Sequence, residues 1–160
     1  FHQHRPAIMG AVLESDVYCE AICDGRHLHP AAVRLLLRCK GWDRVVAITD
    51  SIQAAGLPDG HYKLGVNDVV VEDGDAKLAD TGVRAGSTLS QDTALRNLMA
   101  FTGKSAAEVL PLLTENPARL VGVFGQKGSI EPGKDADLVV LDRAWNVRRT
   151  IVAGESVYEA

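Results

Sequence analysis

Residues 17–23 read Val-Tyr-Cys-Glu-Ala-Ile-Cys and residues 44–49 read Arg-Val-Val-Ala-Ile-Thr, and these two stretches decide the fold. Each is a short apolar run that is followed by an aspartate, which predicts two buried strands that end in turns. Between them, Pro30 suits the first turn of a helix that runs to Cys39, and Gly41 follows its end. The order strand, helix, strand predicts a βαβ unit with parallel strands, covered by helices, and therefore an α/β fold class.

Smaller elements are predicted on both sides of this unit. The alternation from His61 to Leu78, with a turn at Asp73-Gly74-Asp75, predicts a β-hairpin. A short helix is expected over 7–15, and strands are expected at 138–141, 148–152 and 157–158. Three further helices are predicted: one capped by Ser87 or Thr88 and ending near Thr102, one over 106–114 with Ser105 as N-cap, and one from Asn116-Pro117 to about Gly122.

The composition is that of an ordinary globular protein and argues against some classes of partner. The chain has 160 residues, enough for one medium-sized domain, and its net charge of −4 argues against a nucleic-acid partner. No apolar run is long enough to span a membrane and no signal peptide is recognisable, so we expect no membrane partner. The three cysteines, Cys19, Cys23 and Cys39, indicate reduced thiols rather than a disulfide framework, which favours a cytoplasmic location.

Two polar segments follow the predicted strands directly. Asp24-Gly25-Arg26-His27 comes after the first strand, and Thr49-Asp50 comes after the second. Because the carboxyl ends of parallel strands lie at one edge of a sheet, we expect His27 and Asp50 on the same rim. A carboxylate and an imidazole there can share proton transfer or metal binding. The alternative is structural, since an aspartate after a strand is often a turn former or a helix cap.

Other candidate motifs are less specific. The segment Ala85-Gly86-Ser87-Thr88 could offer backbone N–H groups to an anion, although a simple helix cap is the commoner role of such a segment. His2, His4 and His61 lack a partner at ligand spacing, and His29 is expected on the surface. The sequence holds no complete zinc-ligand set, Walker loop, dinucleotide-binding glycine motif or G-x-S-x-G motif.

A series of motifs runs along essentially the whole chain in a recognisable order. They are Asp24–His27 with Pro30, Ile48–Asp50, Ala85–Leu89, Asn116–Arg119 and Gly128–Val139. In order and spacing they resemble the C-terminal half of N-acetylglucosamine-6-phosphate deacetylases of the amidohydrolase superfamily. The last two motifs are shared by the wider superfamily, whereas Asp24–His27 and Ala85–Ser87 point to the deacetylase branch.

The resemblance implies a fold and an activity. The fold would be the C-terminal part of a metal-dependent hydrolase (β/α)8 TIM barrel plus part of a small β-sandwich domain. Residues 1–125 would supply the last two barrel strands, a hairpin insertion and the final helices, and residues 126–160 would supply strands of the sandwich. The activity would be hydrolysis of N-acetylglucosamine 6-phosphate to glucosamine 6-phosphate and acetate in amino-sugar catabolism, by a cytoplasmic homodimer with a divalent metal, Zn or Fe.

The resemblance also implies roles for single residues. Asp50 would take a proton from a metal-activated water and pass it to the leaving amine, and it would be a further metal ligand in a binuclear site. His27 would contact the substrate near the scissile amide, and the backbone of Ala85, Gly86 and Ser87 would help form the sugar-phosphate pocket.

The first residues depart from the family pattern H-H-R-E-P-G, whose arginine binds the phosphate. Here the chain reads His2-Gln3-His4-Arg5-Pro6-Ala7. Aligning the prolines puts His4 at the arginine position, and Arg5, one place later, could also reach a phosphate because a guanidinium fork suits one.

The chain begins at Phe1, which we interpret as the sign of a fragment or a processed piece. The family's metal ligands, a glutamate and two histidines, come from earlier barrel strands that this chain lacks. We therefore expect the chain alone to bind no catalytic metal and to be inactive, and its open sheet edges and apolar helix faces to favour dimerisation.

Two alternatives remain open. Another amidohydrolase, dihydroorotase-like or deaminase-like, would share Asp50 and the Gly133–Leu138 tail but would not be expected to keep Asp24–His27 and Ala85–Thr88 together. The other alternative is a folded fragment or interaction domain with no catalytic role.

Overall fold

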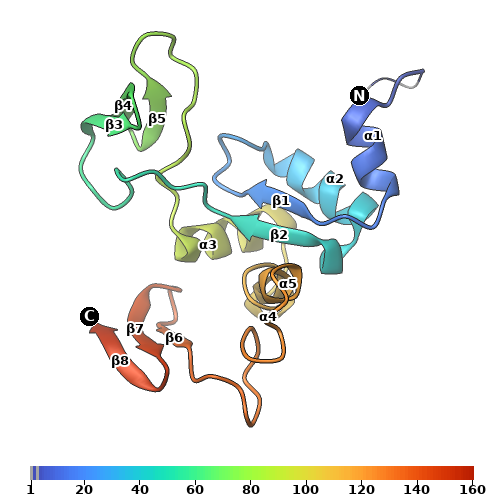
Figure 1. Ribbon diagram of the computed structural model, residues 1–160, viewed down its shortest axis with the longest axis vertical. Helices are drawn as coiled ribbons and strands as arrows, with labels where there is room; N and C mark the ends of the chain where they lie inside the picture. Colours follow the sequence, from blue (N-terminus) through green and yellow to red (C-terminus); the bar gives the residue numbers. More distant parts are fainter. Residues whose placement is uncertain (1, 3) are drawn as a thin grey trace.

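The predicted βαβ unit lies at the centre of the structure, a computed structural model that describes residues 2 and 4–160 (Figure 1). Strand β1 (Cys19–Ile22) pairs in parallel with β2 (Val45–Ile48), so that Ile22 lies opposite Ile48. Helix α2 (Pro30–Lys40) and the 3-10 turn η1 (Trp42–Arg44) connect the two strands. The parallel pairing confirms the sequence prediction, and it brings the residues that follow both strands to one edge of the sheet.

Helices pack on this strand pair and bury its apolar side chains. Helices α2, α3 (Gln91–Thr102) and α5 (Glu115–Leu120) all contact β2. Burying one Val or Leu side chain is worth about 1.5–3 kcal/mol, so the shared core holds these helices in place. Its largest fully buried side chains include Val33, Val45, Leu98, Val109 and Leu112.

Helix α2 begins as the sequence predicts. Pro30 occupies its first turn, where a missing N–H is not needed, and the exposed His29 is the N-cap residue. Nδ1 of His29 accepts the N–H of Ala31 at 3.1 Å. The expected surface position of His29 is therefore confirmed, and its role is structural.

The segment expected to be a hairpin forms a three-stranded antiparallel sheet. Strands β3 (Gly60–Leu64), β4 (Asn67–Glu72) and β5 (Asp75–Leu78) follow one another in sheet order. The predicted turn at Asp73-Gly74 is present, and both residues have positive φ, as a type I′ turn requires. The predicted hairpin is present as β4 and β5, but the prediction missed the third strand, β3, and a second tight turn at Gly65-Val66, where only Gly65, with a φ of +59°, marks the reversal.

Two later helices also differ from their predictions. Helix α3 starts at Gln91 with Ser90 as its N-cap residue, and not after Ser87 or Thr88. The helix expected over 106–114 is divided into α4 (Ala106–Val109) and η2 (Leu110–Leu112), because Pro111 lacks an N–H for a continuous helix. Ser105 caps α4 as predicted, in a capping box with Glu108.

The C-terminal strands form a separate antiparallel sheet, seen at the lower left of Figure 1. It consists of β6 (Leu138–Leu141), β7 (Val147–Val152) and β8 (Glu155–Glu159). A sheet normally buries at least one face. On this sheet, however, five large apolar side chains remain exposed, so the described residues leave this apolar surface uncovered. They are Val139, Val140, Val152, Val157 and Tyr158.

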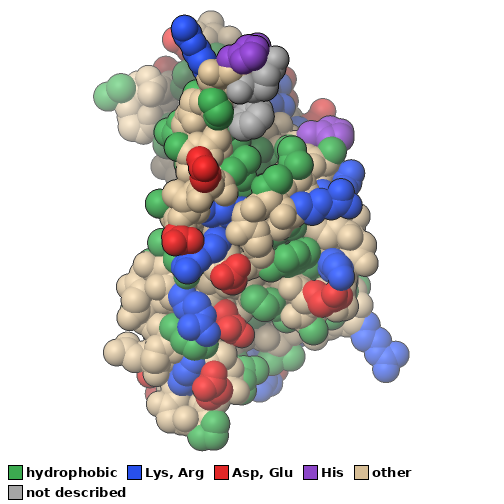
Figure 2. Space-filling view, turned by 90° about the vertical axis from the view of Figure 1, so that its right-hand side faces the viewer, with side chains coloured by type: hydrophobic (Ala, Val, Ile, Leu, Met, Phe, Trp, Pro, Cys, Tyr) green, Lys and Arg blue, Asp and Glu red, His purple; other side chains and the backbone are tan. Residues whose placement is uncertain are grey.

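Helix α1 (Ala7–Glu14) lies near the N-terminus and contacts α2; none of its side chains is fully buried, but Val12 packs partly buried against the core. Ile8 and Met9 on this helix are exposed. Figure 2 views the molecule from this side and shows hydrophobic side chains interspersed with charged ones. Within the described part of the chain, no helix combines the length and the apolar character that crossing a bilayer requires.

Candidate active site

The loop after β1 is organised around the carboxylate of Asp24. Its Oδ1 accepts the backbone N–H groups of Arg26 and His27, both at 2.8 Å, and its Oδ2 lies 2.6 Å from Nδ1 of His27. Gly25 has a φ of +75°, and a side chain added there would approach the ring of Phe101 to 3.3 Å. The sequence Asp-Gly-x-His therefore makes a tight turn that holds the imidazole beside the carboxyl end of β1.

The Asp24 carboxyl is ionised at neutral pH. Its partial burial would raise its pKa, but hydrogen bonds from the backbone and side chain of His27 and from the Arg26 backbone outweigh burial and hold the pKa below its usual value. Burial and the nearby Asp24 charge have the opposite effect on Cys23 and raise the pKa of its thiol to about 12. Cys19 and Cys23 are buried free thiols, as predicted, whereas Cys39 is exposed.

Asp50 follows β2 and is exposed at the same carboxyl edge. Its φ of +50° lies in the left-handed region, which aspartate tolerates better than most residues. Its backbone C=O accepts the N–H of Ser87 at 2.8 Å, which fixes the position of the residue. No hydrogen bond or ion pair joins its carboxylate to another described residue, so both carboxylate oxygens are available to a ligand.

Gly86 lies against Asp50 and accepts no side chain. It has a φ of +66°, and a Cβ there would come within 2.5 Å of Cγ2 of Ile52 and 2.9 Å of the Asp50 backbone oxygen. The same Cβ would lie 3.8 Å from Oδ2 of Asp50, which places the carboxylate beside this glycine. The structure thus brings the predicted segment 85–87 together with Asp50.

Most polar groups of the segment 85–87 are engaged in holding it in place. The N–H of Ala85 donates to Ala76 at 3.0 Å and the N–H of Ser87 donates to Asp50. Ser87 is buried, and its hydroxyl donates to the backbone oxygen of Thr49. Of these three residues, only Gly86 has a backbone N–H without a partner in the described part of the chain.

A pocket of about 330 Å³ next to Asp24 adds polar residues that the sequence analysis did not single out. Asn97 lines it and donates through Nδ2 to the backbone oxygen of Cys23 at 2.9 Å. Ser90, Thr93 and Asn97 are spaced by three and four residues, a helical spacing that places them on one side of α3 and could have revealed them. Arg26 also lines the pocket and donates to the backbone oxygen of Asp73 at 2.5 Å.

His4 and Arg5 are not brought to this rim. Both are exposed, and Arg5 is tied to His2 through a backbone hydrogen bond of 2.9 Å. Figure 1 shows the N-terminus beyond α1, on the side of the molecule away from the carboxyl ends of β1 and β2. Their predicted role in phosphate binding stays a prediction.

The described residues do not form a metal site by themselves. Among residues 2 and 4–160, no group of three or more His, Cys, Asp and Glu side chains is placed to hold one. His27 and Asp50 could supply only part of a coordination shell, because catalytic zinc sites in proteins usually have three protein ligands.

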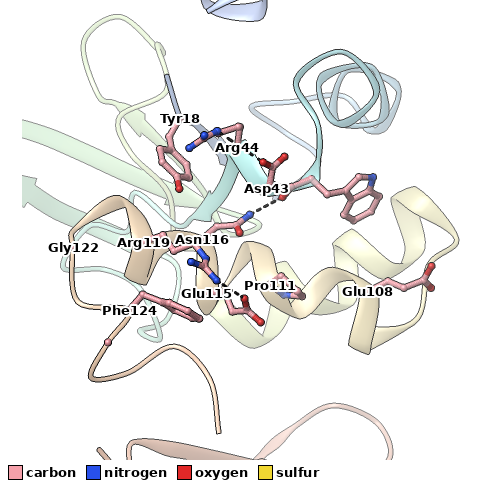
Figure 3. Close-up of a pocket in the computed structure, with 12 residues that line it drawn as sticks. Tyr18, Asp43, Arg44, Glu108, Pro111, Glu115, Asn116, Arg119, Gly122 and Phe124 are labelled. Carbon is pink, nitrogen blue, oxygen red and sulfur yellow. Dashed lines mark hydrogen bonds and ion pairs between the residues drawn. The ribbon is translucent and has the colours of Figure 1, made fainter. Parts of the chain in front are cut away.

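A larger pocket, of about 790 Å³, lies at the opposite, amino-terminal edge of the strand pair (Figure 3). Tyr18 and Arg44, which precede the two strands, line it together with Asn116 of α5. Asn116 Nδ2 donates to the backbone oxygens of Trp42 and Val45 at 2.6 and 2.7 Å, so this polar group fastens α5 to the start of β2. None of the predicted site residues lines this pocket, and we place the candidate site at the carboxyl edge, where α/β enzymes bind their ligands.

Curated relatives match almost the whole chain. The N-acetylgalactosamine-6-phosphate deacetylase of Escherichia coli O157:H7 is 42% identical over 155 residues, which cover 96% of this chain and 41% of that protein. The N-acetylglucosamine-6-phosphate deacetylase of Bacillus subtilis (strain 168) is 38% identical and covers 99% of this chain, which spans 40% of it. A shorter relative from Escherichia coli (strain K12) is 42% identical, and the chain covers 92% of it.

Solved structures show the same relationship. The N-acetylglucosamine-6-phosphate deacetylase of Thermotoga maritima superimposes with a TM-score of 0.91 at 42% identity, over 99% of this chain and 44% of that one. A mutant of the Mycobacterium smegmatis deacetylase in complex with N-acetyl-D-glucosamine-6-phosphate gives a TM-score of 0.90 at 35% identity, over 98% of this chain and 42% of that one. The model of the amidohydrolase family matches residues 2–157, and the chain therefore belongs to this family.

Proposed function

We propose that this chain is the C-terminal part of a deacetylase that hydrolyses N-acetylglucosamine 6-phosphate to glucosamine 6-phosphate and acetate in amino-sugar catabolism. The observation that carries the proposal is the placement of Asp24–His27 and Asp50 at one carboxyl edge, in a chain whose fold and sequence match such deacetylases. In the longer enzyme β1 and β2 are the last two strands of a (β/α)8 barrel, whose active sites lie at this edge.

Asp50 is the proton carrier in this proposal. Its carboxylate is exposed, and no described residue competes for its oxygens. It takes a proton from the attacking water and passes it to the leaving amine, a role that is typically worth 10²–10⁴-fold in rate. His27 contacts the substrate near the scissile amide from the neighbouring strand.

The sugar phosphate is bound by several elements. The free N–H of Gly86 is the group of the segment 85–87 that reaches the substrate, while Ala85 and Ser87 keep the segment in shape. The N-terminus lies away from the carboxyl ends of β1 and β2 (Figure 1), so we assign His4 and Arg5 to the phosphate bound in a second copy. That arrangement agrees with a homodimer.

The metal ligands are supplied by the rest of the longer protein. Amidohydrolases generally depend on a metal, and residues 2 and 4–160 do not form a metal site of their own. A divalent ion, Zn or Fe, is the metal we propose, and Asp50 would be a further ligand only if the site holds two ions. We propose a cytoplasmic enzyme that binds neither nucleic acid nor a membrane. The apolar surface left on β6–β8 supports their place in a small β-sandwich that other segments complete.

A second candidate substrate is the epimer N-acetylgalactosamine 6-phosphate. The Escherichia coli O157:H7 relative, at 42% identity, is named as a deacetylase of this epimer. Both epimers present the same acetamide and phosphate, so the groups described above serve either one. Initial rates measured with the two sugar phosphates side by side decide between them.

The proposal is tested by comparing this chain with a longer protein that includes the missing barrel strands. Metal content and acetate release are measured for both proteins with both sugar phosphates. We expect acetate release from the longer protein only. Metal-dependent deacetylation by the 160-residue chain alone would contradict this division of the site. Hydrolysis of a different amide, such as a cyclic ureide, with neither sugar phosphate accepted, would favour another amidohydrolase, and no hydrolysis at all would favour a non-catalytic fragment.

A further inference from the structure

Each oxygen of the Asp24 carboxylate has its own hydrogen-bond partners. Oδ1 accepts two backbone N–H groups at 2.8 Å, and Oδ2 meets the ring nitrogen Nδ1 of His27 at 2.6 Å. The side chain of Asp24 is 9% exposed and that of His27 is 23% exposed, so water competes little for this contact. The Asp24–His27 contact is therefore not a solvent-exposed ion pair, a type of contact that contributes little to stability.

The position of one proton follows from the charge of this carboxylate. An ionised carboxylate can only accept hydrogen bonds. The backbone hydrogen bonds at Oδ1 and the His27 contact keep Asp24 in that ionised state, since they lower its pKa against the effect of burial. A contact of 2.6 Å between Oδ2 and Nδ1 then requires that Nδ1 carry a hydrogen.

The second ring nitrogen of His27 is left free. Nε2 forms no hydrogen bond with any residue of the described ranges. Every buried polar side-chain atom in those ranges has a partner, so an unpartnered Nε2 is in contact with solvent. It belongs to the loop at the carboxyl edge, where Asp50 also lies.

We infer that Asp24 is a positioning residue that keeps the proton of the neutral His27 ring on Nδ1 and thereby reserves Nε2 for the substrate. The inference rests on the proposed function only for the identity of that substrate, an amino-sugar phosphate. It gives the first aspartate of the Asp-Gly-x-His motif a role distinct from that of a turn former. Proteins often use a carboxylate in this way to orient a histidine that binds a ligand. The hydrogen bond at one ring nitrogen decides whether the other nitrogen carries a proton.

The variant Asp24→Asn separates the two roles of the carboxylate. The amide oxygen can still accept the two backbone N–H groups, so the turn is kept. The amide NH₂ can only donate, so it favours a bare Nδ1 and moves the ring proton to Nε2. Asp142→Asn is the matched control, because Oδ1 of Asp142 also accepts two backbone N–H groups, at 2.8 and 2.9 Å, but contacts no histidine.

The test is a long-range ¹H–¹⁵N spectrum of the histidine rings in the 160-residue chain, at a pH where the rings are neutral. His27→Gln identifies the His27 signals. We expect the Nδ1–H tautomer in the wild type and in Asp142→Asn, and the Nε2–H tautomer in Asp24→Asn. An Nε2–H tautomer in the wild type, or an unchanged tautomer in a folded Asp24→Asn chain, would overturn the inference. If Asp24→Asn does not fold, the wild-type spectrum alone decides.

A kinetic cycle in the longer deacetylase tests whether Asp24 acts through His27. We expect Asp24→Asn to lower kcat/KM on the order of 10–100-fold, the range found when the outer partner of a metal-ligating histidine is removed. The double variant Asp24→Asn/His27→Gln should be no slower than His27→Gln alone, whereas multiplying losses would contradict action through the ring. An Nδ1–H tautomer in a protein that hydrolyses no amino-sugar phosphate would count against the proposed function and leave the Asp24–His27 assignment standing.

Discussion

At the scale of single residues, Gly86 is constrained by its contact with Asp50. Replacing it with alanine forces a side chain into the left-handed region at +66° and against Ile52 and the Asp50 backbone. A strained φ alone costs roughly 1–3 kcal/mol. Gly82→Ala is the control, because Gly82 has a similar φ of +70° but no atom within 4 Å of an added Cβ.

We expect Gly86→Ala to lower Tm more than Gly82→Ala does, since only the first adds a steric clash to the backbone strain. For a protein of this size, each kcal/mol corresponds to about 2–4 °C in Tm. Thermal unfolding followed by circular dichroism measures both variants. Equal losses of Tm would show that the approach of Gly86 to Asp50 is not tight in solution.

His27 is expected to matter for catalysis more than for stability. Its side chain contacts Asp24, which keeps two backbone hydrogen bonds when the ring is removed. His27→Ala in the longer enzyme should therefore lower kcat/KM strongly and leave Tm within a few degrees of wild type. His29→Ala is the control, and it should cost about 0.5–2 kcal/mol of stability through loss of the helix cap without changing the kinetics. A large fall in Tm for His27→Ala with normal kinetics would identify it as a structural residue.

At the scale of elements, Asp75 links the β3–β5 sheet to the loop after β1, which forms part of the candidate site. It receives Arg84 through two hydrogen bonds of 2.9 and 3.0 Å and Lys77 at 3.2 Å, and Arg26 from the loop after β1 lies 3.7 Å away. The Arg84 hydrogen bonds, opposed by burial and assisted by Lys77, hold the pKa of Asp75 below its usual value. A carboxyl whose folded-state pKa is lowered stabilises the fold above its unfolded pKa of about 4 and loses that effect as the pH falls through the folded value.

Asp75→Asn should therefore lower Tm at pH 7 and have a smaller effect at pH 3, which lies below the unfolded pKa. Asp68→Asn in the same sheet is the control, since Asp68 pairs with Lys63 at an exposed position and should change Tm little at either pH. Thermal unfolding of the three proteins at both pH values provides the comparison. An effect of Asp75→Asn that is independent of pH would rule out the ionised carboxylate as its source.

The elements show which parts of the fold a sequence can reveal. β1, α2 and β2 were predictable because apolar runs, Pro30 and Gly41 mark them locally. The start of α3 could not be predicted, because Ser87 does not cap the helix. It donates hydrogen bonds to Thr49 and Asp50 instead, 38 and 37 positions earlier in the chain. The turn at Gly65-Val66 was missed because valine favours a strand and only Gly65 is a typical turn residue, while the pairing of β4 with β3 forces the chain to reverse there.

The candidate site was likewise predictable only in part. The edge that holds Asp50 and His27 could be predicted from the parallel order of two strands. The contact between Asp24 and His27, and the loss of the Ala85 and Ser87 donors to internal hydrogen bonds, depend on side-chain and loop geometry that no spacing rule contains.

At the scale of the whole molecule, exposed apolar surface predicts self-association. Large apolar side chains are exposed on α1 and on β6–β8, including Ile8, Met9, Val139, Val157 and Tyr158. Burying apolar surface is favourable by about 25 cal/mol per Å², so association of two copies through these side chains lowers the free energy. Sedimentation velocity from low to high micromolar concentration should show a dimer or a larger species. A monomer throughout this range would contradict the prediction.

The most direct test concerns Asp50 in the longer deacetylase. We propose that this carboxylate, at the carboxyl edge shared with His27, carries the proton of the hydrolytic reaction. The measurement is kcat for deacetylation of N-acetylglucosamine 6-phosphate by wild type and Asp50→Asn, with metal content and Tm recorded for both. We predict a loss on the order of 10²–10⁴-fold with fold and metal retained. A turnover close to that of the wild type would contradict the account.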